Sequence, residues 1–394
     1  MISKDAPGIL ISGWRFIPHS YAVVSQFECL ELLRRGFGPR LFFEDMPYYN
    51  LCWQPMTGMF GAEADAALRS IPPPSADLRA DVELRYGYPI DLLRPARAVR
   101  TTVFGTAELL CVPPSNVAGG ISIQDAQRCN DFTILTCSKW SKQGFVRSGV
   151  PAERVTVLPL GFDPEVFRPA TPERRAQIRN EMGFAPDDFV FYHAGAMTPN
   201  KGLRFLLAAF ARLGRERPNA RLLLKGMDAL FPSKQLFEEE IGKLEPQLAQ
   251  AAMSRLRYVS GPLSFADMAR IYQAADCYIS SYLAEAFNMP VLEAAACGLP
   301  VICTGGGATD DFVSEHFALQ IASVLHPLVV DGVPEAMGLL PDLEHLVHLM
   351  LCATDDAEFC ASARAAGPTY VGERFTWAKV VDRLLPFLLS GRLD

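Results

Sequence analysis

The 394-residue chain lacks the features that mark several large functional classes. It has no excess of positive charge, because 37 basic residues stand against 44 acidic ones, and the formal net charge of −7 disfavours a protein that binds nucleic acid. No apolar run approaches the ~18 residues that a membrane-spanning helix needs, and the run near the N-terminus is short and interrupted by Gly13. We therefore expect a cytoplasmic protein with no transmembrane segment.

Motifs for metals and nicotinamide cofactors are missing as well. The ten cysteines are scattered and form no Cys-x-x-Cys pair, which favours buried free thiols in a reducing compartment over disulfides or zinc. No Asp-x-Asp occurs, so a metal-bridged diphosphate is not indicated, and we predict neither a metal nor a cofactor. No Gly-x-Gly-x-x-Gly follows the first predicted strand, where Gly13 stands alone, and this disfavours a nicotinamide dehydrogenase.

The residues that are present indicate a packed protein of two or three domains, with 49% hydrophobic and 21% charged residues. In the first part of the chain, short apolar runs alternate with amphipathic segments, which is typical of an α/β layer with parallel strands. The segment 45–80 lacks clean periodicity, and we predict an irregular insertion there. The other predicted elements are a helix over 20–35 and strands over 9–11, 40–43, 99–104, 133–137 and 155–160.

The alternation restarts after a charged stretch that contains three prolines. Ser264 and Asp267 form a capping pair for a helix that ends at Ala275. Asp310 and Asp311 precede an apolar pair, and we interpret them as caps of a further helix in preference to metal ligands. The predicted strands cover 189–193, 221–224, 256–259, 277–279 and 301–303, and further helices begin at 203, 233 and 290 or cover 343–351, 358–365 and 375–389.

These patterns predict two doubly wound α/β domains, at 1–167 and 189–370. A linker with one short helix joins them over 168–188, and a C-terminal helix covers 371–394, with its packing back on the N-terminal domain left open. In open parallel sheets, ligands bind beyond the carboxyl ends of the strands. Two such sheets joined by one linker therefore predict a cleft between the domains.

The densest local signal is the segment 285–293, EAFNMPVLE. Pro290 suits the first position of a helix, where its missing N–H is no loss. The N–H groups of that helix start, with those of Phe287, Asn288 and Met289, make a site for an anion such as a diphosphate. Glu293 would lie in the first turn, where its carboxylate can accept hydrogen bonds from the diol of a ribose, and Glu285 could meet a second hydroxylated group.

This segment resembles the Glu-x7-Glu element of the family 4 retaining glycosyltransferases. That family has the GT-B architecture, in which two Rossmann-like domains face each other across a cleft. Four more segments are similar to the family's motifs in the family's order, and the resemblance spans most of 158–313 but is weak over the first 150 residues. They are 160–169 (LGFDPEVFRP), 195–202 (GAMTPNKG), 258–263 (YVSGPL) and 274–279 (AADCYI).

The resemblance implies roles for individual residues. It makes Glu293 the partner of the donor ribose, Glu285 a contact to the transferring sugar, and Lys201 the cation on the diphosphate. The main chain of Asn288 and Met289 would bind the phosphates, and the main chain of Leu263 the nucleobase. Gly13 matches a turn whose lack of a side chain lets the phosphates approach.

One departure from the family pattern concerns charge. Where the family usually has an arginine beside the turn glycine, this chain has Ala196, so one expected phosphate cation is missing. We hypothesise that Lys225, at the end of a neighbouring strand, replaces it.

Each of these residues also has a structural interpretation that involves no ligand. Glu293 could be a first-turn glutamate favoured by the helix dipole, Lys201 a solvated lysine at a helix start, and Glu285 a surface carboxylate. Gly305–Gly307 resembles a phosphate cradle, but a flexible loop after a strand is the other interpretation.

The predicted function is transfer of a sugar from a UDP- or GDP-sugar to a hydroxyl of a glycan, lipid-linked or protein acceptor. As the resemblance implies, the anomeric configuration is retained without a metal, with Glu285 and Lys201 as the catalytic residues, the C-terminal domain binding the nucleotide sugar and the N-terminal domain facing the acceptor. A GT-B sugar-nucleotide epimerase and an inactive sugar-nucleotide- or glycan-binding module are the alternatives.

The acceptor residues are less sharply indicated. His19 and Glu108 each follow an apolar run of a predicted strand, and the aromatic residues of 45–80 could contact an acceptor or pack as an insertion. Arg94, Arg97 and Arg100 could contact an anionic acceptor, but a solvated helix face is the interpretation we favour. The aromatic segment includes Tyr48, Tyr49 and Trp53, with Met56 nearby.

Overall fold

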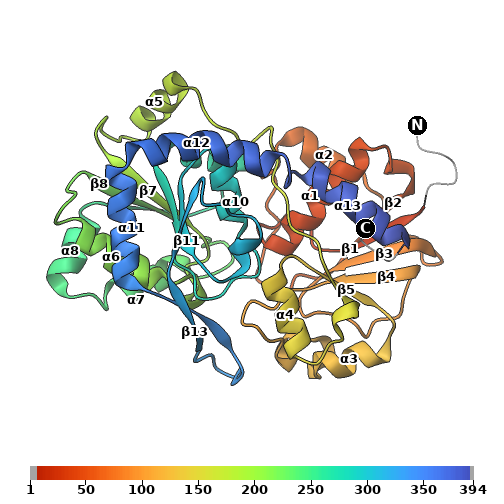
Figure 1. Cartoon of the computed structure of the whole chain (residues 1–394). Coiled ribbons are helices and arrows are strands. Elements are labelled where there is room, and N and C mark those ends of the chain that lie inside the picture. The colour runs from red at the N-terminus through yellow and green to blue at the C-terminus, as the bar shows by residue number, and fades with distance from the viewer. Residues whose placement is uncertain (1–6, 391–394) are drawn as a thin grey trace. The chain divides into compact units, whose positions relative to one another are not determined.

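The structure is a computed structural model, and it describes residues 7–390 (Figure 1). The first six and last four residues, which belong to the predicted segments 1–167 and 371–394, lie outside the described residues. The chain divides into two compact units. Unit 1 comprises the described residues of Met1–Gly161, Leu328–Met337 and Trp377–Asp394, and unit 2 comprises Phe162–Pro327 and Gly338–Thr376.

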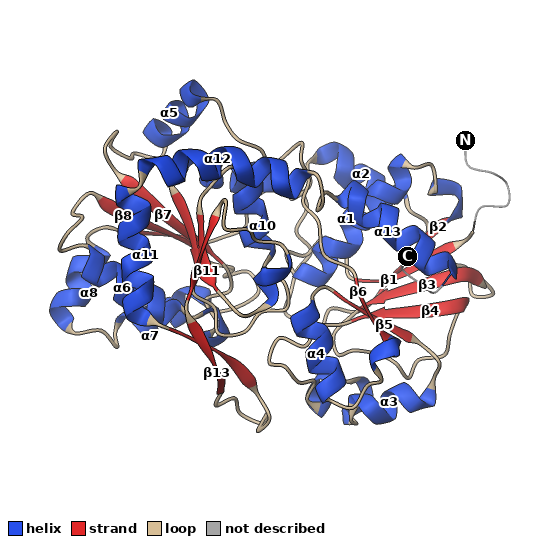
Figure 2. Ribbon diagram, viewed as in Figure 1, coloured by secondary structure: helices blue, strands red, loops and turns tan. Residues whose placement is uncertain are grey.

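Unit 1 is built on a six-stranded sheet with the strand order β2-β1-β3-β4-β5-β6, in which every pairing is parallel. Figure 2 shows these strands between helices. The strands are β1 (Ile9–Gly13), β2 (Leu41–Asp45), β3 (Ala80–Tyr86), β4 (Ala98–Phe104), β5 (Thr133–Thr136) and β6 (Val155–Val157). The α-helices are α1 (Ser20–Arg34), α2 (Ala62–Ser70), α3 (Ile123–Cys129), α4 (Lys139–Arg147) and α13 (Trp377–Ser390), with 3₁₀ turns at Gly38–Arg40, Pro114–Asn116, Ala118–Gly120 and Ala152–Arg154.

Unit 1 contains a helix and a strand that the sequence patterns did not predict. The segment 45–80, predicted to be irregular, contains α2, and the strand β3 was not expected. In β3 the buried residues include Glu83 and Arg85, whose side chains pair at 2.9 Å. The sequence of β3, ADVELRY, alternates apolar and charged residues, so the strand signal was present and was overlooked; the ion pair explains why two of its charged residues are buried in the folded sheet.

The arginines at 94, 97 and 100 do not form a helix face. Arg94 and Arg97 lie in the loop before β4 and pair with the Glu44 carboxylate at 2.9 and 3.0 Å, whereas Arg100 is an exposed residue of β4. The helical interpretation is therefore wrong, because a spacing of three does not distinguish a helix from a loop anchored by ion pairs.

The last helix belongs to unit 1, where it packs on α1. The rings of Phe27 and Trp377 stack with centroids 5.2 Å apart, and Arg35 pairs with Asp382 at 2.8 Å. The C-terminal end of the described chain is thus held by both an apolar and an ionic contact.

Unit 2 contains a second parallel sheet, with the order β12-β11-β10-β7-β8-β9. Its strands are β7 (Phe189–Ala194), β8 (Ala220–Lys225), β9 (Leu256–Val259), β10 (Cys277–Ser280), β11 (Val301–Thr304) and β12 (Ala318–Ile321), and a two-stranded sheet follows, formed by β13 (Ser323–Pro327) and β14 (Met337–Pro341). The helices are α5 (Pro172–Glu181), η5 (Pro199–Lys201), α6 (Leu203–Leu213), α7 (Ser233–Ile241), α8 (Pro246–Met253), α9 (Phe265–Ala274), α10 (Met289–Ala296), η6 (Ala308–Asp311), α11 (Leu343–Asp355) and α12 (Ala357–Gly372).

The core of unit 2 follows from the alternation of side chains along its strands. On β7, Phe191 packs in the apolar cluster that also contains Leu206 and Phe210 of α6. The predicted capping pair is confirmed, because Ser264 Oγ accepts a hydrogen bond from the Asp267 N–H at 3.1 Å. The helix predicted after Asp310 and Asp311 is wrong, since η6 ends there and the Asp310 carboxylate accepts from the Gly306 N–H at 3.0 Å.

Gly202, between η5 and α6, lets two loops of unit 2 approach closely. Its φ is +68°, a left-handed conformation, and an added Cβ would lie 1.8 Å from the main-chain oxygen of Ser281, just beyond β10. Only a residue without a side chain allows this approach.

We predict that Gly202→Ala prevents stable folding or lowers the free energy of unfolding by more than ~4 kcal/mol, because backbone must move. The control is Gly261→Ala, whose φ of +82° is similar but whose added Cβ meets nothing within 4 Å. Its expected loss is about 1 to 2 kcal/mol, the cost of the left-handed conformation alone. Urea unfolding measures both, and equal losses would contradict the close approach.

Candidate active site

The strand order of unit 2 places its central loops at a point where ligands commonly bind. The chain runs outward from β7 through β8 to β9, returns to β10, which pairs with β7, and then continues outward in the other direction. In open parallel sheets, the loops beyond the carboxyl ends at such a reversal form the binding crevice. Lys201 follows β7 and Glu285 follows β10, so both lie in these loops.

Lys201 and Glu285 are in direct contact. The Lys201 Nζ atom lies 2.7 Å from Glu285 Oε1, and the two side chains are 18% and 10% exposed. Asn200, the residue before Lys201, holds the two loops together through two hydrogen bonds. Its carbonyl accepts from the Leu283 N–H at 2.7 Å, and its side-chain amide donates to the Ala284 carbonyl at 3.0 Å. The structure thus brings together the two predicted catalytic residues, which are far apart in the sequence.

The loop before α10 presents main-chain groups. Asn288 has a φ of +78° and donates from Nδ2 to Ser280 Oγ at 2.8 Å, so its side chain does not cap the helix. The first N–H groups of α10 are thus without a side-chain cap, as an anion site requires. Phe287 is buried and its ring stacks on Phe312, so only its main chain could meet a ligand. Helix α10 begins at Met289, one residue before the predicted start.

Glu293 lies deeper than predicted. Because α10 begins at Met289, Glu293 is in the second turn of the helix, and its placement in the first turn is wrong. It is 7% exposed, and its Oε2 accepts a hydrogen bond from the Tyr272 hydroxyl at 2.8 Å. Burial raises the pKa of Glu293 to about 7. A ribose at this carboxylate would share it with Tyr272, which is feasible because a carboxylate accepts several hydrogen bonds.

Two other predicted donor residues lie on neighbouring strands and loops. Lys225, the last residue of β8, is 4% exposed, and its Nζ donates to the Gly226 carbonyl. Burial lowers the pKa of Lys225. Leu263 is half-buried in the loop beyond β9.

The glycine run after β11 is tightly enclosed at Gly307, where an added Cβ would lie 2.6 Å from the Tyr282 hydroxyl oxygen.

Gly13 belongs to unit 1 and has a packing reason to be glycine. It ends β1, and an added Cβ would lie 2.7 Å from the Tyr86 carbonyl oxygen of the neighbouring strand β3. The close approach of two strands therefore accounts for this glycine, and its predicted approach to the donor phosphates stays a prediction.

The predicted acceptor residues lie at the carboxyl edge of the sheet in unit 1. His19 caps α1, with Nδ1 accepting from the Tyr21 N–H at 3.3 Å, and its ring lies against Trp14 and Trp53 with centroids 5.1 and 5.6 Å away. Burial lowers the pKa of His19 to about 4, so its ring is neutral at pH 7. Burial, and to a smaller extent the charge of Glu108, raises the pKa of Tyr21. His19 and Glu108 are thus both close to Tyr21.

Aromatic rings from the predicted acceptor segment extend this edge. Tyr49 is exposed and packs edge-on against Tyr88 with centroids 4.8 Å apart, and it also lies near Trp53 at 6.4 Å. The Tyr48 hydroxyl donates to the Arg15 carbonyl at 2.7 Å. The first residues of 45–80 therefore pack as an ordered aromatic group, and their contact with an acceptor stays a prediction.

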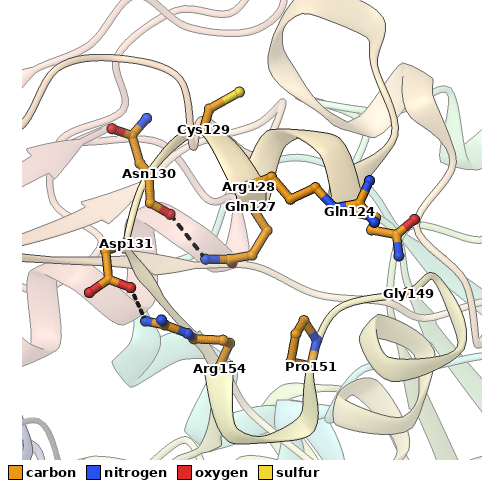
Figure 3. Close-up of a pocket in the computed structure, with 9 residues that line it drawn as sticks. All are labelled: Gln124, Gln127, Arg128, Cys129, Asn130, Asp131, Gly149, Pro151 and Arg154. Carbon is orange, nitrogen blue, oxygen red and sulfur yellow. Dashed lines mark hydrogen bonds and ion pairs between the residues drawn. The ribbon is translucent and has the colours of Figure 1, made fainter.

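A surface hollow of about 430 Å³ in unit 1 contains none of the predicted residues (Figure 3). In this hollow, Arg154 pairs with Asp131, and the Gln127 amide donates to the Asn130 carbonyl at 3.3 Å. Asp131 and Arg154 precede β5 and β6, so the hollow lies at the amino ends of the strands. It is therefore at the edge opposite to the one where ligands bind parallel sheets.

His193, the residue before the last of β7, lies near the site but belongs to none of the motifs in the sequence. It is 2% exposed and close to Lys201, which contributes to the lowering of its pKa. The available signal was a polar residue in an apolar strand, two positions before the turn glycine of 195–202.

Comparison with known proteins identifies the C-terminal part of the chain. Residues 188–331 match the family model described as glycosyl transferases group 1. Over these residues the chain is similar to the group 1 glycosyltransferases. The family expected from the motifs is thereby confirmed, and the glycosyltransferase match contains Lys201, Glu285 and Glu293.

Curated relatives align over parts of the chain. A GDP-mannose-dependent monoacylated alpha-(1-6)-phosphatidylinositol monomannoside mannosyltransferase of Corynebacterium glutamicum is 28% identical over 241 residues, which are 59% of this chain and 55% of the relative. A lipopolysaccharide 1,2-N-acetylglucosaminetransferase of Salmonella typhimurium is 30% identical over 185 residues, 47% of each protein. The chain thus spans about half the length of the curated relatives it matches.

Solved structures extend the likeness to nearly the whole fold. HepE from Anabaena, in complex with UDP and glucose, has a TM-score of 0.69 at 17% identity and covers 98% of this chain and 100% of its own. WaaG, a glycosyltransferase involved in lipopolysaccharide biosynthesis, has a TM-score of 0.63 at 13% identity with the same coverage. The two parallel sheets and these likenesses show the GT-B architecture of two Rossmann-like domains.

None of the helices formed by residues 7–390 is both long enough and apolar enough to cross a bilayer. Within the same residues, histidine, cysteine, aspartate and glutamate side chains form no group of three or more placed to hold a metal ion.

The raised pKa of Glu293 predicts that this residue lowers the free energy of unfolding more at high pH than at low pH. Between about 4.5 and 7 the folded protein keeps a proton that the unfolded chain has released, so the contribution of Glu293 to the free energy of unfolding falls as the pH rises. Glu293→Gln removes this titration but still accepts from Tyr272. We predict that the variant gains about 3 kcal/mol relative to the unchanged protein between pH 5 and pH 8.

Thermal or urea unfolding at both pH values measures this gain. The exposed Glu315, changed to glutamine, is the matched control and should show no such dependence on pH. A gain for Glu293→Gln that is the same at pH 5 and pH 8 would show that the carboxyl is ionised throughout.

Proposed function

We propose that the protein is a retaining, metal-independent glycosyltransferase that moves a sugar from a nucleoside diphosphate donor to a hydroxyl acceptor. The observation that carries this proposal is the contact of Lys201 with Glu285 at 2.7 Å, within the segment that matches the group 1 glycosyltransferases. A cation that can bind phosphate and a carboxylate that can bind sugar hydroxyls are adjacent there, as they must be at the two ends of the bond that breaks.

The chemical step in this proposal is cleavage of the bond between the sugar and the diphosphate. Negative charge develops on the departing diphosphate, and preorganised donors that meet this charge lower the barrier. Lys201 supplies an ammonium, and the main chain of Asn288 and Met289 supplies N–H groups at the start of α10. Glu285 would orient the transferring sugar, and the departing phosphate would help to remove the proton of the acceptor hydroxyl on the same face.

The donor and acceptor are proposed by chemical class. HepE was solved with UDP and glucose, and the Corynebacterium relative is named for its dependence on GDP-mannose, so UDP- and GDP-sugars are the donors to test. Two relatives have names that contain a lipid-bearing molecule, a phosphatidylinositol monomannoside in one and a lipopolysaccharide in the other. We propose a glycan, lipid-linked or protein hydroxyl as the acceptor, with His19 and Glu108 on the acceptor side, in a cytoplasmic protein whose cysteines are free.

The first test is donor hydrolysis and sugar transfer by the unchanged protein and two variants. Lys201→Ala and Glu285→Gln should each lower the rate by ~100-fold or more, because each removes a group from the transition-state contacts. Thermal shifts with UDP, GDP and ADP identify the base, since a ligand at 100 times its dissociation constant adds about 2.7 kcal/mol of stability.

The matched control for Lys201→Ala is Lys234→Ala, which removes an exposed lysine of α7 that pairs with Glu238. It should leave the rate unchanged. Nucleotide binding without hydrolysis or transfer would favour the inactive binding module, and donor conversion in the absence of an acceptor would favour the epimerase. No shift with any of the three nucleotides contradicts the proposal.

Lys225 is tested separately, as the hypothesised substitute for the arginine that Ala196 replaces. Lys225→Met keeps the length of the buried stem and removes the charge. We predict that it weakens donor binding about tenfold at every pH between 6 and 8, as loss of one charged hydrogen bond would. Calorimetric affinities measure this, and affinities equal to those of the unchanged protein would remove Lys225 from the donor site.

A further inference from the structure

His193 has one ring nitrogen fixed and one without a partner. Its Nδ1 lies 2.8 Å from the Ile279 carbonyl oxygen, which can only accept, so Nδ1 carries a hydrogen. In the neutral ring, Nε2 is then a bare acceptor. Nε2 is buried and has no hydrogen-bond partner among the described residues. A buried polar atom in this state is destabilising, and such atoms are rare unless they serve a function.

The unpartnered nitrogen lies beside the predicted diphosphate site. A Cβ added to Gly195 would be 3.9 Å from His193 Nε2 and 3.9 Å from the Cγ atom of Lys201. Gly195 is half-exposed, and apart from Gly195 and its two chain neighbours no other described heavy atom lies within 4 Å of that point. A ligand resting on Gly195 would therefore meet the imidazole and the lysine together. Ala196, the next residue, brings no charge of its own.

We propose, on the basis of the proposed function, that His193 is a further donor-binding residue: its Nε2 takes up one proton from solvent when the sugar nucleotide binds and donates a hydrogen bond to the diphosphate. The step is balanced, since one proton leaves solvent and the added positive charge is matched by the diphosphate. Lys201 and protonated His193 would then both neutralise the leaving group.

The groups around the ring explain why the proton arrives with the ligand. Burial, and to a smaller extent the charge of Lys201, lowers the pKa of His193 to about 4, so the ring is neutral in the free protein at pH 7. Glu285 is already paired with Lys201, and Tyr278, whose ring stacks 6.3 Å away, is held neutral because burial raises its pKa. An anion over Gly195 opposes both effects and favours the imidazolium.

Lys225 differs from His193 in position and in behaviour. His193 pairs with Leu224 in the sheet and Ala194 pairs with Lys225, so the side chains of His193 and Lys225 leave opposite faces. Loss of the Lys225 charge would weaken donor binding at every pH between 6 and 8. Loss of His193 would remove the proton uptake that accompanies donor binding and, with it, the dependence of donor affinity on pH.

The test is calorimetric binding of UDP-glucose, with GDP-mannose as a second probe, in two buffers that differ in protonation enthalpy. Both phosphates of these donors are esterified, so the ligand exchanges no proton between pH 6 and 8. His193→Asn keeps a donor for the Ile279 carbonyl and lacks the Nε2 position. We expect this variant to take up about one proton fewer than the unchanged protein when the donor binds at pH 6, and to bind the donor about tenfold more weakly at that pH. The difference in affinity should be smaller at pH 8.

His193→Gln is the conservative variant, because it places a neutral N–H donor near Nε2. It should recover part of the affinity without recovering the proton uptake. If His193→Asn binds the donor with the same affinity and proton count as the unchanged protein, the inference is wrong although the proposed function stands. If the unchanged protein binds neither donor, the proposed function fails with it.

Gly195→Ala tests the same inference if the histidine variants do not fold. The added methyl group would make ordinary contacts at 3.9 Å, so the unfolding temperature should be unchanged, but it would cover the approach to Nε2. We expect weaker donor binding and loss of the proton uptake. A variant that binds with full proton uptake would place the ligand elsewhere and overturn the inference.

Discussion

The main chain on either side of Lys201 and Glu285 is joined before the two side chains meet. Asn200 binds the loop after β10 through both its carbonyl and its side chain, and Gly202 lets Ser281 approach to a distance that no other residue would allow. The ammonium and the carboxylate are therefore placed by backbone contacts, and the 2.7 Å pair is their result. This junction of two loops sets the position of the ammonium and the carboxylate that a bound anion would meet.

Several buried polar groups near this junction make fewer hydrogen bonds than they would make in water. The carboxylate of Glu293 is buried beside one hydroxyl, and His193 keeps a ring nitrogen without a described partner. Burying such groups lowers the stability of the free protein, because desolvation is incompletely offset. A ligand that satisfies these atoms would recover part of that cost on binding. The arrangement is consistent with a site that is prepared for its ligand and less well suited to being empty.

The sequence predicted most strands of both sheets, because their apolar runs are short and separated by clear helical segments. It did not predict β3, where Glu83 and Arg85 neutralise each other inside the sheet, nor α2 within 45–80. At the site, motif spacing identified Lys201 and Glu285, but it placed Glu293 in the first turn of its helix and not in the second, since the helix begins one residue earlier, at Met289. His193 could not be recognised, because the state of its Nε2 depends on the Ile279 carbonyl and on Gly195 in the folded chain.

The Lys201–Glu285 contact joins residues 84 positions apart, and the strand order that permits it places β10 beside β7, with β8 and β9 on the other side of β7. Contacts between such distant residues are reached late, since the intervening chain must first lose its freedom. A polypeptide still being synthesised therefore cannot assemble this pair until the ribosome has released the residues beyond β10. Recognition of an anion by both loops thus requires a chain that extends at least through Glu285, beyond β10.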